Sequence, residues 1–215
     1  MKVKVFPSLL AADFSKIESE IKKVQDAGVD AIHLDVMDNK YVPNTSFPIK
    51  QIKSFYKKIS LPIDIHLMIE KPEEVIEQYL QFNPSFLSFH VEACSEPKKL
   101  IQKIKEKGCK VGLAVNAGIP VSSILPLIDL IDFVLVMTVN AGFGGQKFMK
   151  ENIKKIRELN KIKKEKKLFF EIEVDGGINT ENVSQLIDAG ASMIVSGTTI
   201  FKSDSVSNTI KKLRG

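Results

Sequence analysis

Short apolar runs alternate with segments of helical periodicity along the whole chain. Eight of these runs have the length and apolar content of buried strands. Between them, apolar residues recur three or four positions apart, as at Ile17, Ile21 and Val24, which is the spacing of one helix face. The predicted strands cover residues 3–9, 31–37, 62–69, 86–91, 110–116, 133–139, 168–174 and 192–197. We therefore expect eight strands that alternate with eight helices.

Three glycines mark the same place in this alternation. Gly28, Gly108 and Gly190 each follow a helical segment and precede a predicted strand. Glycine often ends a helix because it adopts the left-handed backbone conformation without a clash at Cβ. Three of the predicted helices should therefore end at these positions.

The alternation of strands and helices predicts the fold class. Such a pattern is typical of α/β proteins with a parallel sheet and right-handed crossovers. No linker or shift in composition divides the chain, so we expect a single domain over residues 1–215. A closed (β/α)8 TIM barrel fits best, and a doubly wound open sheet is the alternative. In a barrel, the residues that carry chemistry should cluster at the C-terminal ends of the strands.

Composition narrows the class of protein. Hydrophobic residues make up 44% and charged residues 27%, which is the balance of a globular protein in water. No apolar run approaches the roughly 20 residues that span a bilayer, so we expect no membrane association. The two cysteines, Cys94 and Cys109, form no CxxC motif and suit a reducing compartment, which predicts a cytoplasmic protein.

The net charge of +5 is concentrated in the lysine-rich segment 150–167. Apolar residues recur along one side of this segment, which indicates a solvated barrel helix. No aromatic residues lie between the lysines, so stacking on bases, and with it nucleic-acid binding, is not expected. A mild positive field would attract an anionic small molecule such as a sugar phosphate.

Polar residues of unusual kind occur on the predicted strands. Side chains two apart in a strand share a face, so His33 and Asp35 point the same way. Asp64 and His66 repeat this arrangement in the next strand, and Asp175 follows the strand at 168–174. Imidazole and carboxylate together bind Zn, Fe(II), Mn or Co without selecting sharply among them. Either histidine alone is typical of a hydrogen-bonded core residue, but the combination favours a metal site.

Other polar residues near these ends have more than one interpretation. Asp64 and Glu173 could orient the metal ligands, or they could belong to a polar network in the barrel core. We place His90 outside the metal site, as a core or rim histidine. Asp38 has the opposite parity to Asp35 and is expected to shape a loop.

Glycine-rich loops follow three of the predicted strands, at residues 140–146, 175–178 and 196–199. Exposed backbone N–H groups in such loops bind phosphate, and barrels commonly bind it after strands seven and eight. Any one of these loops alone is a weak signal and more typical of a simple turn, but three in succession favour a phosphate site. A metal opposite a phosphate, with two carboxylates, suits an epimerase that acts next to a carbonyl group.

Five motifs resemble the ribulose-phosphate 3-epimerase family. They are PSLLAADF at 7–14, HLDVMDNKYVPN at 33–44, DIHLM at 64–68, VNAGFGGQ at 139–146 and EVDGG at 173–177. The resemblance implies a (β/α)8 barrel of the ribulose-phosphate-binding type. It also implies an isomerase of the pentose phosphate pathway that interconverts D-ribulose 5-phosphate and D-xylulose 5-phosphate through an enediolate.

The resemblance also implies roles for residues. It places one divalent metal ion per subunit on His33, Asp35, His66 and Asp175, with Asp35 as general base and Asp175 as general acid. It implies a homo-oligomer. The implied substrate contacts are Ser8, His66, Gly142, Phe143, Gly144, Gly145, Asp175, Gly176, Gly177, Gly197 and Thr198, and the implied apolar lining is Met37, Met68 and Met137.

Three positions depart from the family pattern. Ala141 replaces a usual proline, which we expect to loosen the loop after the sixth predicted strand. Phe47-Pro48 stands where Phe-Gly-Pro is common, and Thr198 replaces a serine but keeps the hydroxyl. None of these positions is an implied ligand or acid/base.

Three alternatives differ in function. The nearest is D-allulose-6-phosphate 3-epimerase, which shares this chemistry on a longer sugar. A decarboxylase of the orotidine-phosphate group needs an Asp-x-Lys-x-x-Asp pattern, which the ends of the strands at 31–37 and 62–69 lack. A sugar-phosphate binding protein without activity should have lost a ligand, yet all four are present.

Overall fold

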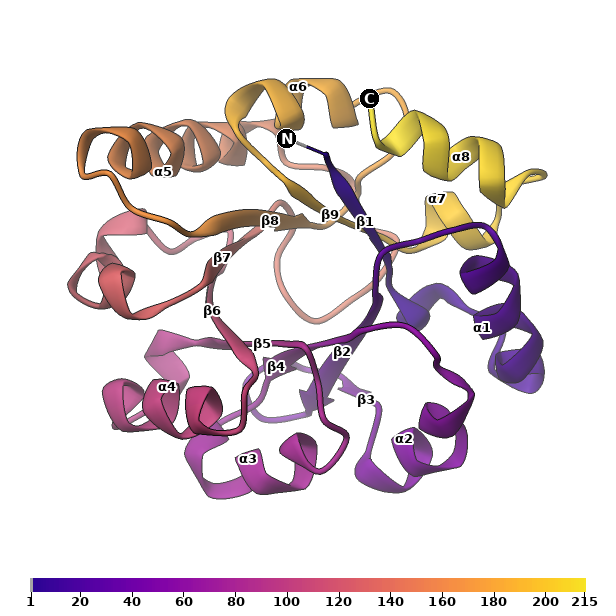
Figure 1. Ribbon diagram of the computed structural model, residues 1–215, viewed down its shortest axis with the longest axis horizontal. Helices are drawn as coiled ribbons and strands as arrows, with labels where there is room; N and C mark the ends of the chain where they lie inside the picture. Colours follow the sequence, from indigo (N-terminus) through magenta and orange to yellow (C-terminus); the bar gives the residue numbers. More distant parts are fainter. Residues whose placement is uncertain (1) are drawn as a thin grey trace.

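Nine strands form one sheet that curls into a barrel, as the view down its axis shows (Figure 1). The computed structural model describes residues 2–215. The strand order is β1-β9-β8-β7-β6-β5-β4-β2-β3, and every pairing is parallel except that of β2 with β3. The strands are β1 (Lys4–Pro7), β2 (Ile32–Asp38), β3 (Thr45–Ser46), β4 (Ile63–Met68), β5 (Phe86–His90), β6 (Lys110–Val115), β7 (Phe133–Met137), β8 (Glu171–Asp175) and β9 (Met193–Ser196).

The barrel closes between β1 and β2. Ser8 forms a parallel bridge with His33, and the amide of Asp30 donates to the carbonyl of Val5 over 3.1 Å. The closed barrel is therefore confirmed, and all eight predicted strands are present. The short strand β3 was not predicted, because two paired residues are too few to produce a hydrophobic pattern.

Helices surround the ring of strands (Figure 1). The α-helices are α1 (Ile17–Asp26), α2 (Ile49–Phe55), α3 (Pro72–Leu80), α4 (Pro97–Glu106), α5 (Ile153–Glu165), α6 (Val183–Ala189), α7 (Thr198–Phe201) and α8 (Val206–Leu213). The 3-10 turns are η1 (Leu9–Ala11), η2 (Phe14–Lys16), η3 (Tyr56–Lys58), η4 (Val91–Ala93), η5 (Val121–Ser123), η6 (Leu125–Leu130) and η7 (Lys150–Asn152).

The predicted strict alternation is wrong at one connection. Between β6 and β7 the chain forms η5 and η6 and no α-helix, whereas α7 and α8 both follow β9. Pro120 and Pro126 lie in the β6–β7 connection, and proline removes an amide donor and clashes with the preceding turn of an α-helix. By contrast, Pro72 sits in the first turn of α3, where no amide is needed.

The predicted glycine stops are confirmed. Gly28, Gly108 and Gly190 have φ of +79°, +74° and +122° and follow α1, α4 and α6.

Within residues 2–215, no helix combines the length and the apolar content needed to cross a membrane.

Apolar residues fill the interior of the barrel toward the N-terminal ends of the strands, which we call the lower end. The ring of Phe86 lies 5.5 Å from that of Phe6 and 6.0 Å from that of Phe133. Gly112 makes room for this packing, because a Cβ there would come within 2.4 Å of the Phe133 ring. Below the rings, Lys4 and Glu171 form an ion pair of 2.8 Å. The upper interior is left to the polar ends of the strands, where a barrel carries its site.

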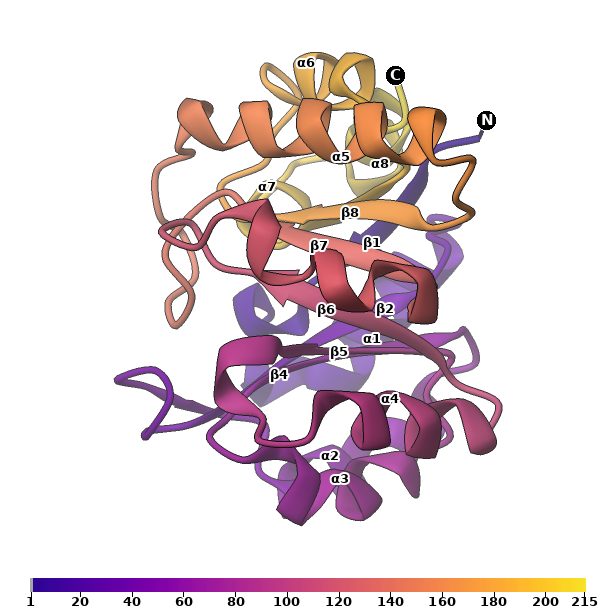
Figure 2. The ribbon, with the colours of Figure 1, turned by 90° about the vertical axis from the view of Figure 1, so that its left-hand side faces the viewer.

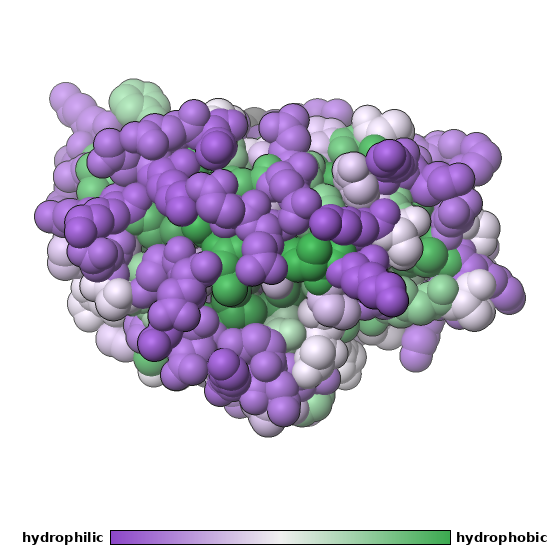
Figure 3. All heavy atoms as spheres, turned by 90° about the horizontal axis from the view of Figure 1, so that it is seen from below, coloured by the Kyte–Doolittle hydropathy of each residue, from purple (hydrophilic) through white to green (hydrophobic). Residues whose placement is uncertain are grey.

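The outer surface is mostly polar, and long loops project from one end of the barrel. Seen from the side of α2 and α3, hydrophilic side chains cover most of the surface, and hydrophobic ones show between them (Figure 3). Loops after β2 and β7 project from one end of the barrel (Figure 2). That end is where the strands finish, so these loops stand over the polar residues.

Candidate active site and metal centre

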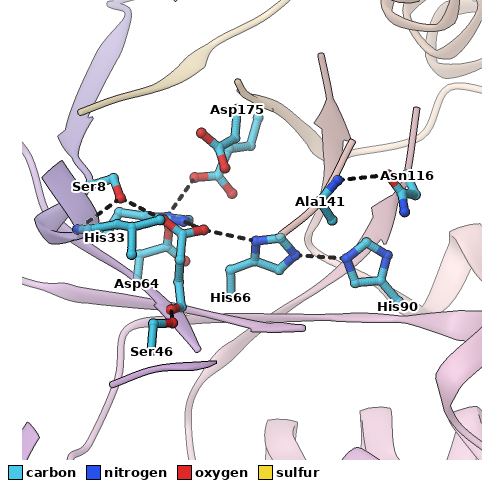
Figure 4. Close-up of polar contacts among 12 residues, drawn as sticks. Ser8, His33, Ser46, Asp64, His66, His90, Asn116, Ala141 and Asp175 are labelled. Carbon is cyan, nitrogen blue, oxygen red and sulfur yellow. Dashed lines mark hydrogen bonds and ion pairs between the residues drawn. The ribbon is translucent and has the colours of Figure 1, made fainter. Parts of the chain in front are cut away.

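Strand register brings the predicted metal ligands together. In the β2–β4 pair, His33 lies opposite Asp64 and Asp35 opposite His66, so the four side chains share the inner face. Asp175 reaches them from the end of β8. Potential ligand atoms of His33, Asp35, His66 and Asp175 all lie within 4.8 Å of one another. The side chains of His33, His66 and Asp175 converge in Figure 4. The structure thus unites all four residues that the sequence proposed as ligands.

A carboxylate fixes the ring of His33. Its Nδ1 lies 2.5 Å from Oδ2 of Asp64, and its Nε2 faces Oδ1 of Asp35 at 3.2 Å. His33 and Asp64 are fully buried. Because Nδ1 is taken by Asp64, Nε2 is the nitrogen available to an ion. This contact supports the interpretation of Asp64 as an orienting partner.

A second histidine backs the ring of His66. Its Nδ1 faces Oδ1 of Asp35 at 3.4 Å, and its Nε2 lies 2.9 Å from Nε2 of His90. His90 is absent from the four-residue cluster and lies behind it. It is thus a buried core histidine, as expected, but one in contact with a candidate metal ligand.

Asp35 is held from two sides. The hydroxyl of Ser8 donates to its Oδ2 over 2.5 Å, and the hydroxyl of Ser46 donates to its backbone carbonyl. Ser8 follows β1, so the closure of the barrel places it here. The carboxylate therefore has a fixed orientation, with Oδ1 toward the two histidines.

The two aspartates have different proton affinities. Burial works to raise the pKa of Asp35, but the His33 and His66 imidazoles outweigh it and hold that pKa well below its usual range. Burial and the charge of Asp35 raise the pKa of Asp175 to about 7. Asp35 is therefore ionised near neutral pH, while Asp175 exchanges its proton there.

The histidines also differ. Burial would lower the pKa of His33, but the carboxylates of Asp35 and Asp64 outweigh it and raise that pKa well above its usual value. Burial lowers the pKa of His66 to about 4, so this ring is neutral and keeps a lone pair for a ligand bond.

The cluster has the chemistry of a divalent cation site. Oδ1 of Asp64 and both carboxyl oxygens of Glu173 are buried without a hydrogen-bond partner among the described residues. Burial and the nearby Asp64 raise the pKa of Glu173 well above its usual value. Buried carboxylates in such number need protons or a cation. Two imidazoles and two carboxylates are ligands for Zn, Mn, Fe(II) or Co, so the residues fit a divalent ion.

A cavity of about 230 Å³ opens above the cluster. Asp35 and Asp175 line it, whereas His33 and His66 lie beneath and are fully buried. His66 belongs to the four-residue cluster and is absent from the residues that line the cavity, although the resemblance also implies a substrate contact for it. The predicted residues on the wall are Ser8, Met37, Met68, Met137, Gly142, Phe143, Gly144, Gly145, Gly176, Gly177, Gly197 and Thr198.

The far wall of the cavity is mostly backbone. Gly177 has φ of +64°, and a Cβ there would come within 2.7 Å of the Phe148 amide nitrogen. The side-chain amide of Asn182 donates to the carbonyl of Gly177 over 2.9 Å and fixes this turn. Glycine is needed here for the backbone conformation and for the close approach of the 146–148 segment.

Two loops meet over the cavity mouth. The side-chain amide of Asn44 donates to the carbonyl of Gly142 over 2.7 Å, and Phe143 is 52% exposed at the rim. Asp38 accepts bonds from the amides of Tyr41 (3.0 Å) and Glu70 (2.8 Å), so it shapes the loop after β2 as expected.

The departure at Ala141 adds a bond. The Ala141 amide donates to Oδ1 of Asn116 over 3.2 Å, which a proline at this position could not do. The expected loosening of the loop is therefore opposed by a contact that the substitution itself provides.

Comparisons with known proteins agree with this geometry. The model of the "Ribulose-phosphate 3 epimerase family" matches residues 4–201. The ribulose-phosphate 3-epimerase of Bacillus subtilis (strain 168) is 42% identical over 214 residues, which cover 99% of each chain. That of Escherichia coli (strain K12) is 37% identical over 211 residues, covering 98% of this chain and 94% of the relative. The chain belongs to the ribulose-phosphate 3-epimerase family.

Members of the ribulose-phosphate 3-epimerase family are enzymes, and this chain is an epimerase. Solved structures that are more distant in sequence support the fold alone. The tryptophan synthase alpha-subunit of Pyrococcus furiosus superposes with a TM-score of 0.69 at 14% identity, and each chain is covered to 99%. Phosphoribosyl anthranilate isomerase from Thermococcus kodakaraensis gives 0.66 at 16% identity, with 99% and 97% coverage.

Several wall residues of this epimerase were not predicted individually as substrate contacts, although five of them lie in the glycine-rich loops at 140–146, 175–178 and 196–199 that were expected to bind phosphate. The residues are Leu10, Ala11, Val139, Asn140, Gln146, Ile178, Asn179, Val195, Ser196 and Thr199. Most are neighbours of predicted motifs, and their position directly after a strand end was a signal that could have found them. The contact of His90 with His66 had no such signal, because it depends on the pairing of Ser88 with His66 between β4 and β5.

Proposed function

We propose that this enzyme inverts C3 of D-ribulose 5-phosphate to give D-xylulose 5-phosphate, reversibly and with one divalent metal ion, in the pentose phosphate pathway. The observation that carries the proposal is the pair of aspartates on the cavity wall. Asp35 and Asp175 come from different strands and differ in pKa, with Asp35 far below its usual range and Asp175 at about 7. One ionised and one protonated carboxyl group are what a base and an acid require.

The two residues would work in sequence. Asp35 removes the proton from C3, and Asp175 delivers a proton to the other face of the resulting enediolate. In the reverse reaction they exchange roles. Ser8 holds Asp35 in place through its 2.5 Å hydrogen bond, so the base does not turn away from the substrate.

His33, Asp35, His66 and Asp175 would hold the metal ion. A divalent ion polarises the neighbouring carbonyl group and so makes the C3 proton more acidic. His33 and His66 lie beneath the cavity and serve as ligands, while Asp35 and Asp175 also reach the substrate.

The opposite wall would bind the phosphate. None of the described residues that line the cavity is lysine or arginine. Recognition would therefore rest on backbone amides at Gly177, Gly197 and Thr198 and on nearby hydroxyl groups, as in other barrels. Met37, Met68 and Met137 also line the cavity and would keep the reacting carbons in apolar surroundings.

We also propose that residues 1–215 act as one barrel domain in a cytoplasmic homo-oligomer, as the family resemblance implies. Light scattering coupled to size-exclusion chromatography measures the oligomeric state directly. A single peak at the monomer mass of 24.0 kDa would contradict this part of the proposal.

The test follows the C3 proton. Chelated enzyme is divided, reloaded with Zn²⁺, Mn²⁺, Co²⁺ or Fe²⁺, and given ribulose 5-phosphate in D₂O. We expect xylulose 5-phosphate with deuterium at C3 in the reloaded samples and none in the chelated one. Turnover that is unaffected by chelation, with no bound metal, would overturn the metal-dependent mechanism. The same assay on a hexulose 6-phosphate decides whether the longer sugar is preferred.

A further inference from the structure

His90 ends β5 and lies directly behind His66. The two Nε2 atoms are 2.9 Å apart, the ring centroids 5.1 Å apart, and both side chains are fully buried. The proposed acid/base scheme does not use His90, yet a buried imidazole needs a partner. We propose that His90 is a positioning residue that fixes the tautomer of His66, so that Nδ1 of His66 presents its lone pair to the metal ion. The inference rests on the proposed metal-dependent function.

The hydrogen bond between the two Nε2 atoms has room for one proton, so one ring donates and the other accepts. Nδ1 of His66 faces Asp35 and the ligand cluster, so metal binding requires a lone pair on this nitrogen. The ring proton must then sit on Nε2, where it donates to Nε2 of His90. His90 accepts with that nitrogen and therefore carries its own proton on Nδ1.

Glu92 and Tyr41 favour this tautomer of His90. Oε1 of Glu92 lies 3.5 Å from Nδ1 of His90, so a carboxylate attracts the proton to that nitrogen. The same oxygen accepts a 2.8 Å bond from the hydroxyl of Tyr41. The Tyr41 ring lies over His90 with centroids 4.7 Å apart, which restricts the rotation of the imidazole. The chain of contacts thus runs from the loop after β2 to a metal ligand.

The same task is done differently on β2. Asp64 accepts from Nδ1 of His33 over 2.5 Å and leaves Nε2 for the ion. Ring nitrogens of metal-bound histidines are commonly fixed by such an acceptor, usually a carboxylate, carbonyl or water. His90 would fill that place with an imidazole lone pair, so the two ligands use opposite nitrogens for the metal.

A tautomer measurement on the wild-type protein tests the inference directly. The chain has three histidines, so long-range ¹⁵N–¹H spectra of the Zn²⁺-loaded enzyme are simple to assign. We expect a proton on Nε2 of His66 and on Nδ1 of His90. A proton on Nε2 of His90 in the loaded enzyme would overturn the inference.

Metal affinity provides a second readout. Without an acceptor for its Nε2–H, His66 in a His90→Phe variant should lose orientation, and Zn²⁺ and Co²⁺ should bind about 10–100-fold more weakly. His90→Gln places an amide oxygen near the lost nitrogen and should restore affinity close to the wild type. Ser88→Ala is the matched control, because Ser88 is buried on the same strand and has no hydrogen-bond partner among the described residues.

Thermal unfolding of the metal-free variants separates folding from positioning. A merely structural role would lower the metal-free midpoint and leave the Zn²⁺ affinity and the Co²⁺ absorption spectrum as in the wild type, which would overturn the inference. Equal weakening in His90→Phe and His90→Gln would also overturn it. If His90→Phe does not fold, His90→Gln and the tautomer spectra still decide. A wild-type enzyme that binds no divalent ion would overturn the proposed function together with the inference, whereas wild-type binding with the wrong tautomers would overturn the inference alone.

Discussion

The two walls of the cavity are built in different ways. The proposed metal side consists of side chains on β2 and β4, which register places opposite one another, and of Asp175 at the end of β8. These side chains are largely buried. The proposed phosphate side consists of loop backbone after β7, β8 and β9, with glycines where side chains would intrude. Proton transfer needs groups fixed to within a fraction of an ångström, which strands provide. Phosphate needs several amides at close range, which a bare loop provides.

Charge differs between the walls as well. The metal side gathers carboxylates and imidazoles whose pKa values move in opposite directions, whereas the described lining residues of the phosphate side include no lysine or arginine. Changes on the metal side should therefore act on kcat and on pH dependence. Changes on the phosphate side should act on KM.

Asp175→Asn should have the largest effect. It removes the acid of the proposed reaction, so kcat should fall by about 10³-fold or more, with KM little changed. Asp35 remains, so C3 of ribulose 5-phosphate should still exchange with D₂O faster than it epimerises, while xylulose 5-phosphate should do neither.

Proton NMR of both substrates in D₂O measures these rates, and metal analysis shows whether the ion is retained. Asp188→Asn, an exposed change on α6, is the control. Full activity in Asp175→Asn would refute the two-aspartate mechanism.

Gly177→Ala tests the phosphate side. The residue has φ of +64°, and a Cβ would meet backbone atoms of Phe148 and Gln146 within 2.9 Å. Displacement of this loop should raise KM by about tenfold or more, which corresponds to a loss of about 1.4 kcal/mol in binding free energy. Steady-state kinetics measure it, and metal affinity should stay unchanged. Gly118→Ala is the matched control, because no atom lies within 4 Å of a Cβ there. A loss confined to kcat would contradict the division between the walls.

The metal-free enzyme should lose stability as pH rises. The pKa of Asp175 is about 7 in the folded state and about 3.9 in an unfolded chain, so the folded state binds more protons between these values. Stability from this group therefore falls from about pH 4 to about pH 7 and is then constant.

Thermal midpoints of the metal-free protein at pH 5.5 and pH 8 measure this effect. The fall should be larger in the wild type than in Asp175→Asn by a few degrees, since about 1 kcal/mol shifts the midpoint of a chain this long by about 2–4 °C. Equal pH profiles would show that Asp175 is ionised throughout. Loading with Zn²⁺ should remove the difference, because the ion favours the carboxylate.

Asn44→Ala should have the smallest effect. It removes the 2.7 Å bond to Gly142 that joins the two loops over the cavity. One such bond contributes about 1 kcal/mol, so KM should rise a few-fold while kcat stays constant. Steady-state kinetics measure both constants, and Asn208→Ala, a change at an exposed position, is the control. A fall in kcat without a change in KM would place this loop on the metal side.

Much of the site could be predicted from residue order. Parity along a strand placed His33 and Asp35 on one face, and the motif DIHLM repeated that arrangement, so a metal site followed without a structure. The contact of His66 with His90 was not predicted, because it depends on the register between β4 and β5. The roles of Asp64 and Glu173 stayed open for the same reason. Glycine stops were predicted correctly, since their cause is local.

The sequence by itself determined the strands, the helix ends and the residues with metal-binding and acid/base chemistry, because each depends on spacing and on side-chain type. Tertiary structure decided which of these residues meet. Closure between β1 and β2 brought Ser8 to Asp35. The position of β8 in the barrel brought a carboxylate oxygen of Asp175 within 4.8 Å of one of Asp35, although about 140 residues separate the two aspartates in the sequence. Proton affinities were decided at the same step, because burial and neighbouring charge exist only after the barrel has closed.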